Sequence, residues 1–250
     1  MKSKTHMLAT DLDGTLVGDE EALRSLLKYY EEQPYDVSFI YVTGRHLSSA
    51  LLLIEEEGLP VPDILISDVG ASIYVGKHFN EDAEWAKRMQ ANWDPVEIAG
   101  IVARFPELKR QLLPNEKRVS YTMENGDERT VYQVEEALIQ EKLPHKLIVS
   151  SNRDVDILPM KSGKGEALQY VIDTYANDNV QVLIAGDSGN DLDMLSLDYP
   201  SVIVGNAQEE LAILQPDPLL YRATSHCAGG IQEAWMHFYE KMNTEPTPPS

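Results

Sequence analysis

The stretch DLDGTLVG at residues 11–18 follows the short apolar run at residues 7–9. In an extended segment, residues i and i+2 point to the same side, so the side chains of Asp11 and Asp13 are expected to project together. Two neighbouring carboxylates repel each other unless a proton or a cation lies between them. The stretch therefore predicts a strand that delivers two acids to a cation site.

A second acidic stretch, AGDSGNDLDML at residues 185–195, comes after another apolar run. We expect a strand that ends at Gly186 and a helix that begins near Asn190. Asp187 and Asp191 would then lie at the carboxyl end of that strand. Ligands that are all oxygens favour Mg²⁺, a hard ion that suits phosphate chemistry.

Apolar periodicity alternates between helical and strand-like segments along most of the chain. In order, these segments are 20–32, 37–42, 48–57 and 64–67, and then 164–175, 180–185, a helix from Asn190, and 201–204. The alternation predicts an α/β fold with a Rossmann-like parallel sheet covered by helices. In such a fold, functional groups gather at the carboxyl ends of the strands.

The periodicity changes between residues 79 and 158, where mixed helix and strand signals indicate an inserted α+β domain or lid. We therefore predict that residues 1–78 and 159–243 form one core domain and that residues 79–158 form a cap. Residues 244–250 are rich in Pro and Thr, and we expect them to be disordered.

Two further segments follow or open a core element. Thr43, Gly44 and Arg45 come directly after a predicted strand, so the Thr43 hydroxyl and the adjacent backbone N–H groups are candidates for binding phosphate oxygens. Lys164 opens a predicted helix after a glycine, where its ammonium can neutralise a phosphate or hold Asp11 in place.

An EF-hand calcium loop also begins with D-x-D-G, but this sequence departs from that pattern. Thr15 stands at loop position 5, Leu16 at position 6 where glycine is needed, and Ala22 at position 12 in place of Glu. Each acidic or glycine-containing segment alone also fits an ordinary polar turn or helix start. Their joint occurrence in this order on one α/β chain favours a single site.

The composition excludes several classes of protein. The chain of 250 residues is 43% apolar and 25% charged, and we expect no membrane span because no long apolar run occurs. A formal net charge of −20 repels phosphate backbones and predicts no nucleic-acid partner. The single cysteine, Cys227, excludes an internal disulfide, and with no signal-peptide core we expect a cytoplasmic protein.

Four motifs occur in order and resemble those of the haloacid dehalogenase superfamily of aspartate-nucleophile phosphatases: DLDGT (11–15), Thr43, Lys164 and GDSGND (186–191). Five further segments resemble the sucrose-phosphate phosphatase branch of that superfamily: RVSYTM (118–123), SSNRDVDILP (150–159), KGEALQYV (164–171), GNAQEEL (205–211) and YRATSHCAGGIQEA (221–234). The resemblance implies a C2-type α/β cap between the second and third motifs.

The resemblance also implies a role for each acid. Asp11 would attack phosphorus and form an aspartyl-phosphate. Asp13 would protonate the departing sugar oxygen and then take a proton from the attacking water. Mg²⁺ would be held by the Asp11 carboxylate, the Asp13 backbone carbonyl and Asp187. Asp191 would support the metal site directly or through water.

The same resemblance implies which residues hold the phosphoryl group. Thr43 and Lys164 would bind its oxygens as charge shifts in the transition state. Gly44, Arg45 and Asn190 complete the expected phosphate-binding set.

The cap segments supply candidates for sugar binding. These are Arg118, Asp154 and Asp156, with a solvated face or an ordinary ion pair as the alternative. Trp85 and Trp93 have the flat side chains that stack on sugar rings, but we favour core packing for both.

The resemblance implies a Mg²⁺-dependent phosphatase that converts sucrose 6-phosphate to sucrose and phosphate. Mannosylfructose phosphate and a simpler hexose phosphate stay open as substrates. A phosphomutase of the same superfamily is one alternative, and a non-catalytic sugar-phosphate sensor or synthase subunit is another. We expect a monomer that acts on a small sugar phosphate and associates with a sugar-phosphate synthase.

Overall fold

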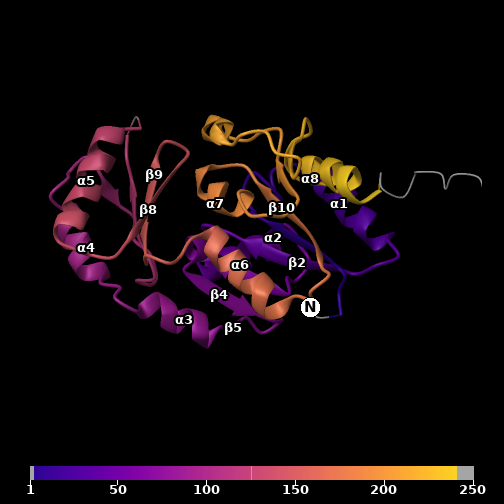
Figure 1. Cartoon of the computed structure of the whole chain (residues 1–250), viewed down its shortest axis with the longest axis horizontal. Helices are drawn as coiled ribbons and strands as arrows, with labels where there is room; N and C mark the ends of the chain where they lie inside the picture. Colours follow the sequence, from indigo (N-terminus) through magenta and orange to yellow (C-terminus); the bar gives the residue numbers. More distant parts are fainter. Residues whose placement is uncertain (1–2, 125, 241–250) are drawn as a thin grey trace, which may run out of the picture.

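The computed structural model describes residues 3–124 and 126–240, and the tail that we predict to be disordered, 244–250, lies outside them. In this part of the chain the strands form two sheets, one of eight strands and one of four (Figure 1). The smaller sheet lies at one end of the molecule, next to α4 and α5.

The larger sheet has the strand order β12-β11-β10-β1-β2-β3-β4-β5. Its pairs from β12 to β3 are parallel, and the pairs β3–β4 and β4–β5 are antiparallel. The bounds are β1 His6–Thr10, β2 Val37–Val42, β3 Ile64–Ser67, β4 Ser72–Val75, β5 Asn80–Glu81, β10 Gln181–Gly186, β11 Ser201–Ile203 and β12 Leu220–Arg222. The predicted α/β fold with a Rossmann-like sheet is confirmed.

Helices cover both faces of this sheet. α1, α2 and α8 pack into one apolar cluster, whereas α3, α6 and α7 pack into the other. The bounds are α1 Glu20–Glu31, α2 Leu47–Glu56, α3 Ala83–Gln90, α6 Lys164–Tyr175, α7 Leu192–Leu195 and α8 Cys227–Trp235. No helix in the described residues combines the length and the apolar character that crossing a membrane requires.

The central strand β1 shows why both faces need cover. Leu8 packs into the cluster that contains α1, whereas its neighbours Met7 and Ala9 pack into the cluster that contains α6. Successive side chains of a strand point to opposite faces, so a strand that is apolar at consecutive positions needs helices on both sides. The three side chains are at most 1% exposed.

Local sequence also sets the bounds of α1. The side chain of Asp19 caps the helix by accepting a hydrogen bond from the N–H of Ala22 at 3.0 Å. Such a cap is worth about 1 kcal/mol. Leu23, Leu26 and Tyr30 then recur at helical spacing and are buried against the sheet.

The four-stranded sheet is antiparallel, with the order β6-β7-β9-β8. We call the part built around it, residues 95–158, the small unit. Its bounds are α4 Pro95–Val102, β6 Lys109–Arg110, β7 Val119–Thr122, α5 Glu128–Gln140, β8 Lys146–Ser150 and β9 Asp154–Leu158. The small unit has an apolar cluster of its own. The division into a core and a cap of residues 79–158 stays a prediction.

Three elements differ from the sequence-based expectation. The helix expected from Asn190 begins as a 3₁₀ turn, Gly189–Asp191, in which the N–H of Asp191 donates to the carbonyl of Ser188, three residues back, at 2.9 Å. Strand β9 is not among the expected strands, since two acids interrupt its short apolar pattern. Helix α3 lies in the predicted insert but packs onto the larger sheet.

Candidate active site

Three loops of the candidate site meet because they follow neighbouring parallel strands. Asp11 follows β1, Thr43 follows β2 and Asp187 follows β10. β1 lies between β10 and β2 in the sheet. The carboxyl ends of parallel strands meet at one edge, so the topology brings together residues that are far apart in sequence.

Asp11, Asp187 and Asp191 form a buried acidic cluster. One carboxylate oxygen from each residue lies within 4.8 Å of the other two. The residues are 5%, 7% and 0% exposed. Three of the four acids predicted to bind metal are therefore gathered here, and the side chain of the fourth, Asp13, lies outside the cluster.

Lys164, the first residue of α6, brings a cation to this cluster. Its Nζ donates to Oδ1 of Asp11 at 2.7 Å and to Oδ1 of Asp191 at 2.6 Å. The Lys164 side chain is only 1% exposed. The sequence-based expectation that Lys164 contacts Asp11 agrees with this geometry.

The charges of the cluster are out of balance. Burial raises the pKa of the Asp11 carboxyl well above its ordinary value, although Lys164 opposes the shift. Burial, followed by repulsion from Asp191, raises the pKa of Asp187 to about 6. Burial lowers the pKa of Lys164, but Asp11 and Asp191 outweigh it and raise the pKa above its ordinary value. One ammonium faces three buried carboxyls, which favours a further cation at this place.

The hydrogen bonds show which oxygens remain for a metal ion. Asp191 uses Oδ1 for Lys164, and its Oδ2 accepts from the backbone N–H groups of Asp187 at 2.9 Å and Ser188 at 3.0 Å. Asp191 therefore shapes the loop. Oδ2 of Asp11 and Oδ2 of Asp187 accept no hydrogen bond from the described residues. A set of hard oxygens with two unused members fits Mg²⁺.

The remaining residues of DLDGT support Asp187. The hydroxyl of Thr15, a residue to which the sequence assigns no role, donates to Oδ1 of Asp187 at 2.8 Å. A Cβ at Gly14 would lie only 2.8 Å from Oδ2 of Asp187, and the φ of Gly14 is +77°. This position accepts only glycine because a side chain would fill the space beside the carboxylate.

Asp13 and Arg45 form a bidentate ion pair beside the cluster. Nε of Arg45 donates to Oδ2 of Asp13 at 2.7 Å, and Nη2 donates to Oδ1 at 2.8 Å. The Arg45 side chain is 34% exposed and the Asp13 side chain is 52% exposed. Strand β1 ends at Thr10, before both acids, so Asp11 and Asp13 do not share the simple alternation of a strand and differ in burial.

Hydrogen bonds within the loop after β2 and to Val69, in the segment after β3, hold this loop in place. Thr43 is fully buried, and its hydroxyl accepts a hydrogen bond from the N–H of Arg45 at 3.1 Å. The Thr43 carbonyl accepts from the N–H of Val69 at 3.1 Å. A Cβ at Gly44 would lie 3.9 Å from Nδ2 of Asn190, so the loops after β2 and β10 face each other.

The candidate sugar-binding residues of the small unit have partners within the protein. Arg118 donates from Nη1 to Oδ1 of Asp156, and both residues are less than a tenth exposed. Asp154 accepts from Nε2 of Gln111 at 3.1 Å. The arrangement of Arg118 and Asp156 matches the ion-pair alternative, and sugar binding by the three residues stays a prediction.

Both tryptophans pack against apolar clusters, in agreement with the core packing that we favoured over sugar stacking. Trp85 is 3% exposed and donates its indole N–H to the carbonyl of Gly70 at 3.1 Å. Trp93 packs against the cluster of the small unit and donates to the carbonyl of Glu116 at 2.7 Å.

Two further residues of the site region come from the segment 205–211, to which the sequence assigns no specific role. Nδ2 of Asn206 donates to the carbonyl of Gly14 at 2.7 Å and so holds the loop after β1. Glu210 accepts from the backbone N–H groups of Ser151 at 3.0 Å and of Gly189. The resemblance of segment 205–211 to the sucrose-phosphate phosphatase branch was the feature of the sequence that could have pointed to these two residues.

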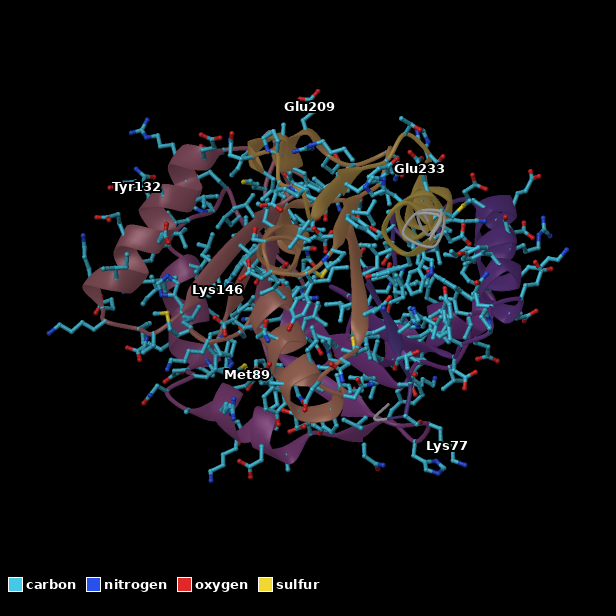
Figure 2. All side chains as sticks on the ribbon, turned by 45° about the vertical axis from the view of Figure 1, so that its right-hand side comes forward. Lys77, Met89, Tyr132, Lys146, Glu209 and Glu233 are labelled. Carbon is cyan, nitrogen blue, oxygen red and sulfur yellow. The ribbon has the colours of Figure 1, made fainter. Side chains whose placement is uncertain are left out.

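Lys146 of β8, labelled in Figure 2, links the small unit to α7 and to the loop before α6. Its Nζ donates to Oδ2 of Asp193 and to the carbonyl of Ser162, both at 2.9 Å. Asp193 belongs to α7, directly after the loop that carries Asp191. Contacts between the two parts of the chain therefore lie next to the acidic cluster.

This fold and these loops define the class of the protein. A mainly parallel sheet, with acids after two central strands and a lysine at the start of a neighbouring helix, is the architecture of the haloacid dehalogenase superfamily. Solved members of that superfamily share the fold. More narrowly, the chain belongs to the sucrose-6F-phosphate phosphohydrolase family, whose model matches residues 4–239.

The chain is similar to three proteins with different names. A Synechocystis sucrose-phosphatase, solved with sucrose and phosphate, is 36% identical, with a TM-score of 0.88 over 94% of this chain and 98% of that one. A mannosylfructose-phosphate phosphatase from Agrobacterium fabrum is 30% identical over 93% of this chain and 96% of the relative. A glucosylglycerol-phosphate synthase from Pseudomonas anguilliseptica is 38% identical over 93% of this chain, which spans only 30% of that protein's length.

Proposed function

We propose that the protein is a Mg²⁺-dependent phosphatase that hydrolyses sucrose 6-phosphate to sucrose and phosphate. The observation that carries the proposal is the buried contact between Lys164 and Asp11 inside a cluster of three acids. A carboxylate held by an ammonium on one oxygen, with its other oxygen unused, is arranged to act as a nucleophile.

Asp11 is the proposed nucleophile. Lys164 orients the carboxylate through its hydrogen bond to Oδ1. One carboxylate oxygen would attack phosphorus and form the aspartyl-phosphate, and the other would be left for the metal ion. Splitting one displacement into two steps replaces a difficult attack by water with an attack by a positioned carboxylate. Water then hydrolyses the aspartyl-phosphate and restores Asp11.

Asp13 is the proposed acid and base. It protonates the sugar oxygen that leaves, and it takes a proton from water in the second step. In this structure both oxygens of Asp13 accept from the fork of Arg45, so this ion pair has to open before Asp13 can carry and transfer a proton. The greater exposure of Asp13 supports contact with the leaving group and with water.

Metal binding is assigned to Asp11, Asp187 and the backbone carbonyl of Asp13, with Asp191 in support. When bound, Mg²⁺ would offset the negative charge of the phosphoryl oxygens near the carboxylates. Asp187 is oriented for this by Thr15, and Asp191 holds the backbone of Asp187 and the ammonium of Lys164.

The phosphoryl oxygens are assigned to the loops after β2 and β10 and to Lys164. Gly44 and Asn190 face each other between these loops, Thr43 directly precedes Gly44, and Arg45 adds charge at the edge. Preorganised donors of this kind stabilise charge that develops in the transition state. Residues 79–158 form the proposed cap, which would exclude water and select the leaving group.

Sucrose 6-phosphate is proposed because the family and a sucrose-phosphatase similar over nearly the whole chain point to it. Mannosylfructose phosphate is the second candidate, since a relative of similar length bears that activity in its name. The synthase relative supports association with a sugar-phosphate synthase as a further proposal. A monomeric state and a place in the cytoplasm stay predictions.

The test is Mg²⁺-dependent phosphate release from four substrates in parallel: sucrose 6-phosphate, mannosylfructose phosphate, glucose 6-phosphate and fructose 6-phosphate. Preference for sucrose 6-phosphate, lost in Asp11→Asn, is the expected result. Equal rates on all four would keep the phosphatase and reject the disaccharide. Isomerised sugar phosphate without free phosphate would indicate a mutase, and binding without turnover would indicate a sensor.

A further inference from the structure

The side chain of Arg118 crosses from the small unit to the loop after β2. Arg118 directly precedes β7, and its Nη2 donates to the carbonyl of Gly44 at 2.7 Å. The residue is 8% exposed. One buried guanidinium therefore connects the small unit to the loop that carries Thr43.

The other side of this guanidinium is anchored in the small sheet. Nη1 donates to the hydroxyl of Ser120 at 2.9 Å and to the carboxylate of Asp156. Ser120 and Asp156 face each other across β7 and β9. Because a planar guanidinium held at one edge has little freedom, its position reports the position of the small sheet.

The Nε donor of Arg118 has no partner among the described residues. Its Nε is buried without a hydrogen bond, and so is Oδ1 of Asp68. These two atoms face each other at 3.8 Å. The distance is too long for a hydrogen bond, although the two groups have opposite charge and no water-exposed route to other partners.

Asp68 lies in a backbone segment that holds the loop after β2. The φ angles of Asp68, Val69 and Gly70 are 52°, 56° and 92°. Aspartate adopts such angles more readily than most residues, but they are unfavourable for a β-branched valine, so the surroundings must stabilise Val69. The N–H of Asp68 donates to the carbonyl of Arg45 at 2.8 Å, and the N–H of Val69 donates to that of Thr43.

We propose that Arg118 is a positioning residue that latches the small unit onto the phosphate-binding loop, acting through Gly44 and Asp68 rather than on the sugar. A small movement of the small unit towards the larger sheet completes the bond between Nε of Arg118 and Asp68. The loop of Thr43 then has its working geometry only when the small unit is seated. This inference rests on the proposed function.

A latch and a sugar contact predict different substrate profiles. A residue that binds sugar affects sucrose 6-phosphate and leaves an aryl phosphate such as p-nitrophenyl phosphate unaffected. A residue that positions the phosphate loop affects both substrates, because both present the same phosphoryl group. It also weakens inhibition by orthovanadate, which carries no sugar at all.

Three variants separate the two roles: Arg118→Lys, Asp68→Asn and the double variant. Arg118→Lys keeps a positive charge but lacks the fork. Asp68→Asn keeps the shape of a fully buried side chain that no substrate can touch. Arg129→Lys on the exposed surface of α5 is the matched control.

We expect each single variant to lower kcat on both substrates by a similar factor, about 10- to 100-fold, as expected for a misplaced loop. The double variant should be no slower than the slower single variant, because the two residues act as one unit. Loss on sucrose 6-phosphate alone, a fully active Asp68→Asn, or a double loss equal to the product of the single losses would overturn the latch.

Separate control experiments test whether each variant is folded and whether the proposed function holds. Thermal unfolding shows whether a variant is folded, and if Arg118→Lys fails to fold, Asp68→Asn decides alone. If the wild type binds inorganic phosphate but turns nothing over, the proposed function fails. The latch is then judged by calorimetry: weaker phosphate binding in both variants supports it, and unchanged binding rejects it.

Discussion

The ammonium of Lys164 lies 2.7 Å from Oδ1 of Asp11, and the two side chains are 1% and 7% exposed. The same ammonium also contacts Asp191, so Lys164 is fixed from two sides and holds Asp11, the proposed nucleophile, in one orientation. A single buried cation therefore serves the fold and the proposed chemistry together. Variants of the cluster separate these two contributions.

Asp11→Asn should abolish turnover and preserve the fold. The amide has the same shape but is no nucleophile, and we expect a loss of about 10³-fold or more in kcat by analogy with other nucleophile replacements. Phosphate release from sucrose 6-phosphate measures the loss, and circular dichroism with thermal unfolding checks the fold. A folded variant within tenfold of the wild-type rate would reject Asp11 as the nucleophile.

Lys164→Ala should affect both rate and stability. Loss of a preorganised charge lowers kcat by about 10²-fold or more. Without Mg²⁺, the variant leaves buried carboxylates without their cation, which costs about 3 kcal/mol of unfolding free energy. Kinetics and urea denaturation measure the two effects. Lys161→Ala, on an exposed lysine of the same segment, is the matched control. Wild-type kcat in Lys164→Ala would show that the lysine has only a structural role.

Mg²⁺ should stabilise the folded protein even without substrate. A divalent ion relieves the repulsion among Asp11, Asp187 and Asp191, and at 100 times its Kd it adds about 2.7 kcal/mol to the unfolding free energy. Asp187→Asn removes one proposed ligand, so its melting temperature should rise less on adding Mg²⁺. The exposed Asp178→Asn should respond like the wild type. An equal rise in all three proteins would place the ion elsewhere.

Much of the larger sheet could be predicted because its signal is local. The strand Ile64–Ser67 and the helix Lys164–Tyr175 have the bounds that the apolar pattern indicates. Strand β9 escaped prediction because Asp154 and Asp156 break its apolar run, and its stability comes from pairing with β7 and β8. Tertiary pairing of this kind leaves little trace in a short segment.

Some contacts of the candidate site could likewise be predicted from the sequence, and others could not. Asp11 and Asp187 follow predicted strands, so the rule for carboxyl ends of parallel strands brought them together in advance. The contact of Arg118 with Gly44 joins residues 74 positions apart, and no periodicity encodes it. The roles of Thr15 and Asp68 likewise depend on which side chains the folded loops bring into contact.

Glu233 of α8 should make stability depend on pH (Figure 2). It accepts hydrogen bonds from the Tyr221 hydroxyl at 2.8 Å and from the N–H of Ser225 at 3.0 Å. Burial raises its pKa, but these bonds outweigh burial and lower it to about 2.

The carboxyl of Glu233 in the unfolded chain takes up its proton at about pH 4.3. The contribution of Glu233 to stability is therefore complete above about pH 5 and is lost as the pH falls towards 2. The difference in unfolding free energy between wild type and Glu233→Gln, from urea denaturation, should therefore shrink with acidification. Glu136→Gln, on the exposed surface of α5, is the matched control. A difference that stays constant from neutral to acidic pH would contradict this assignment.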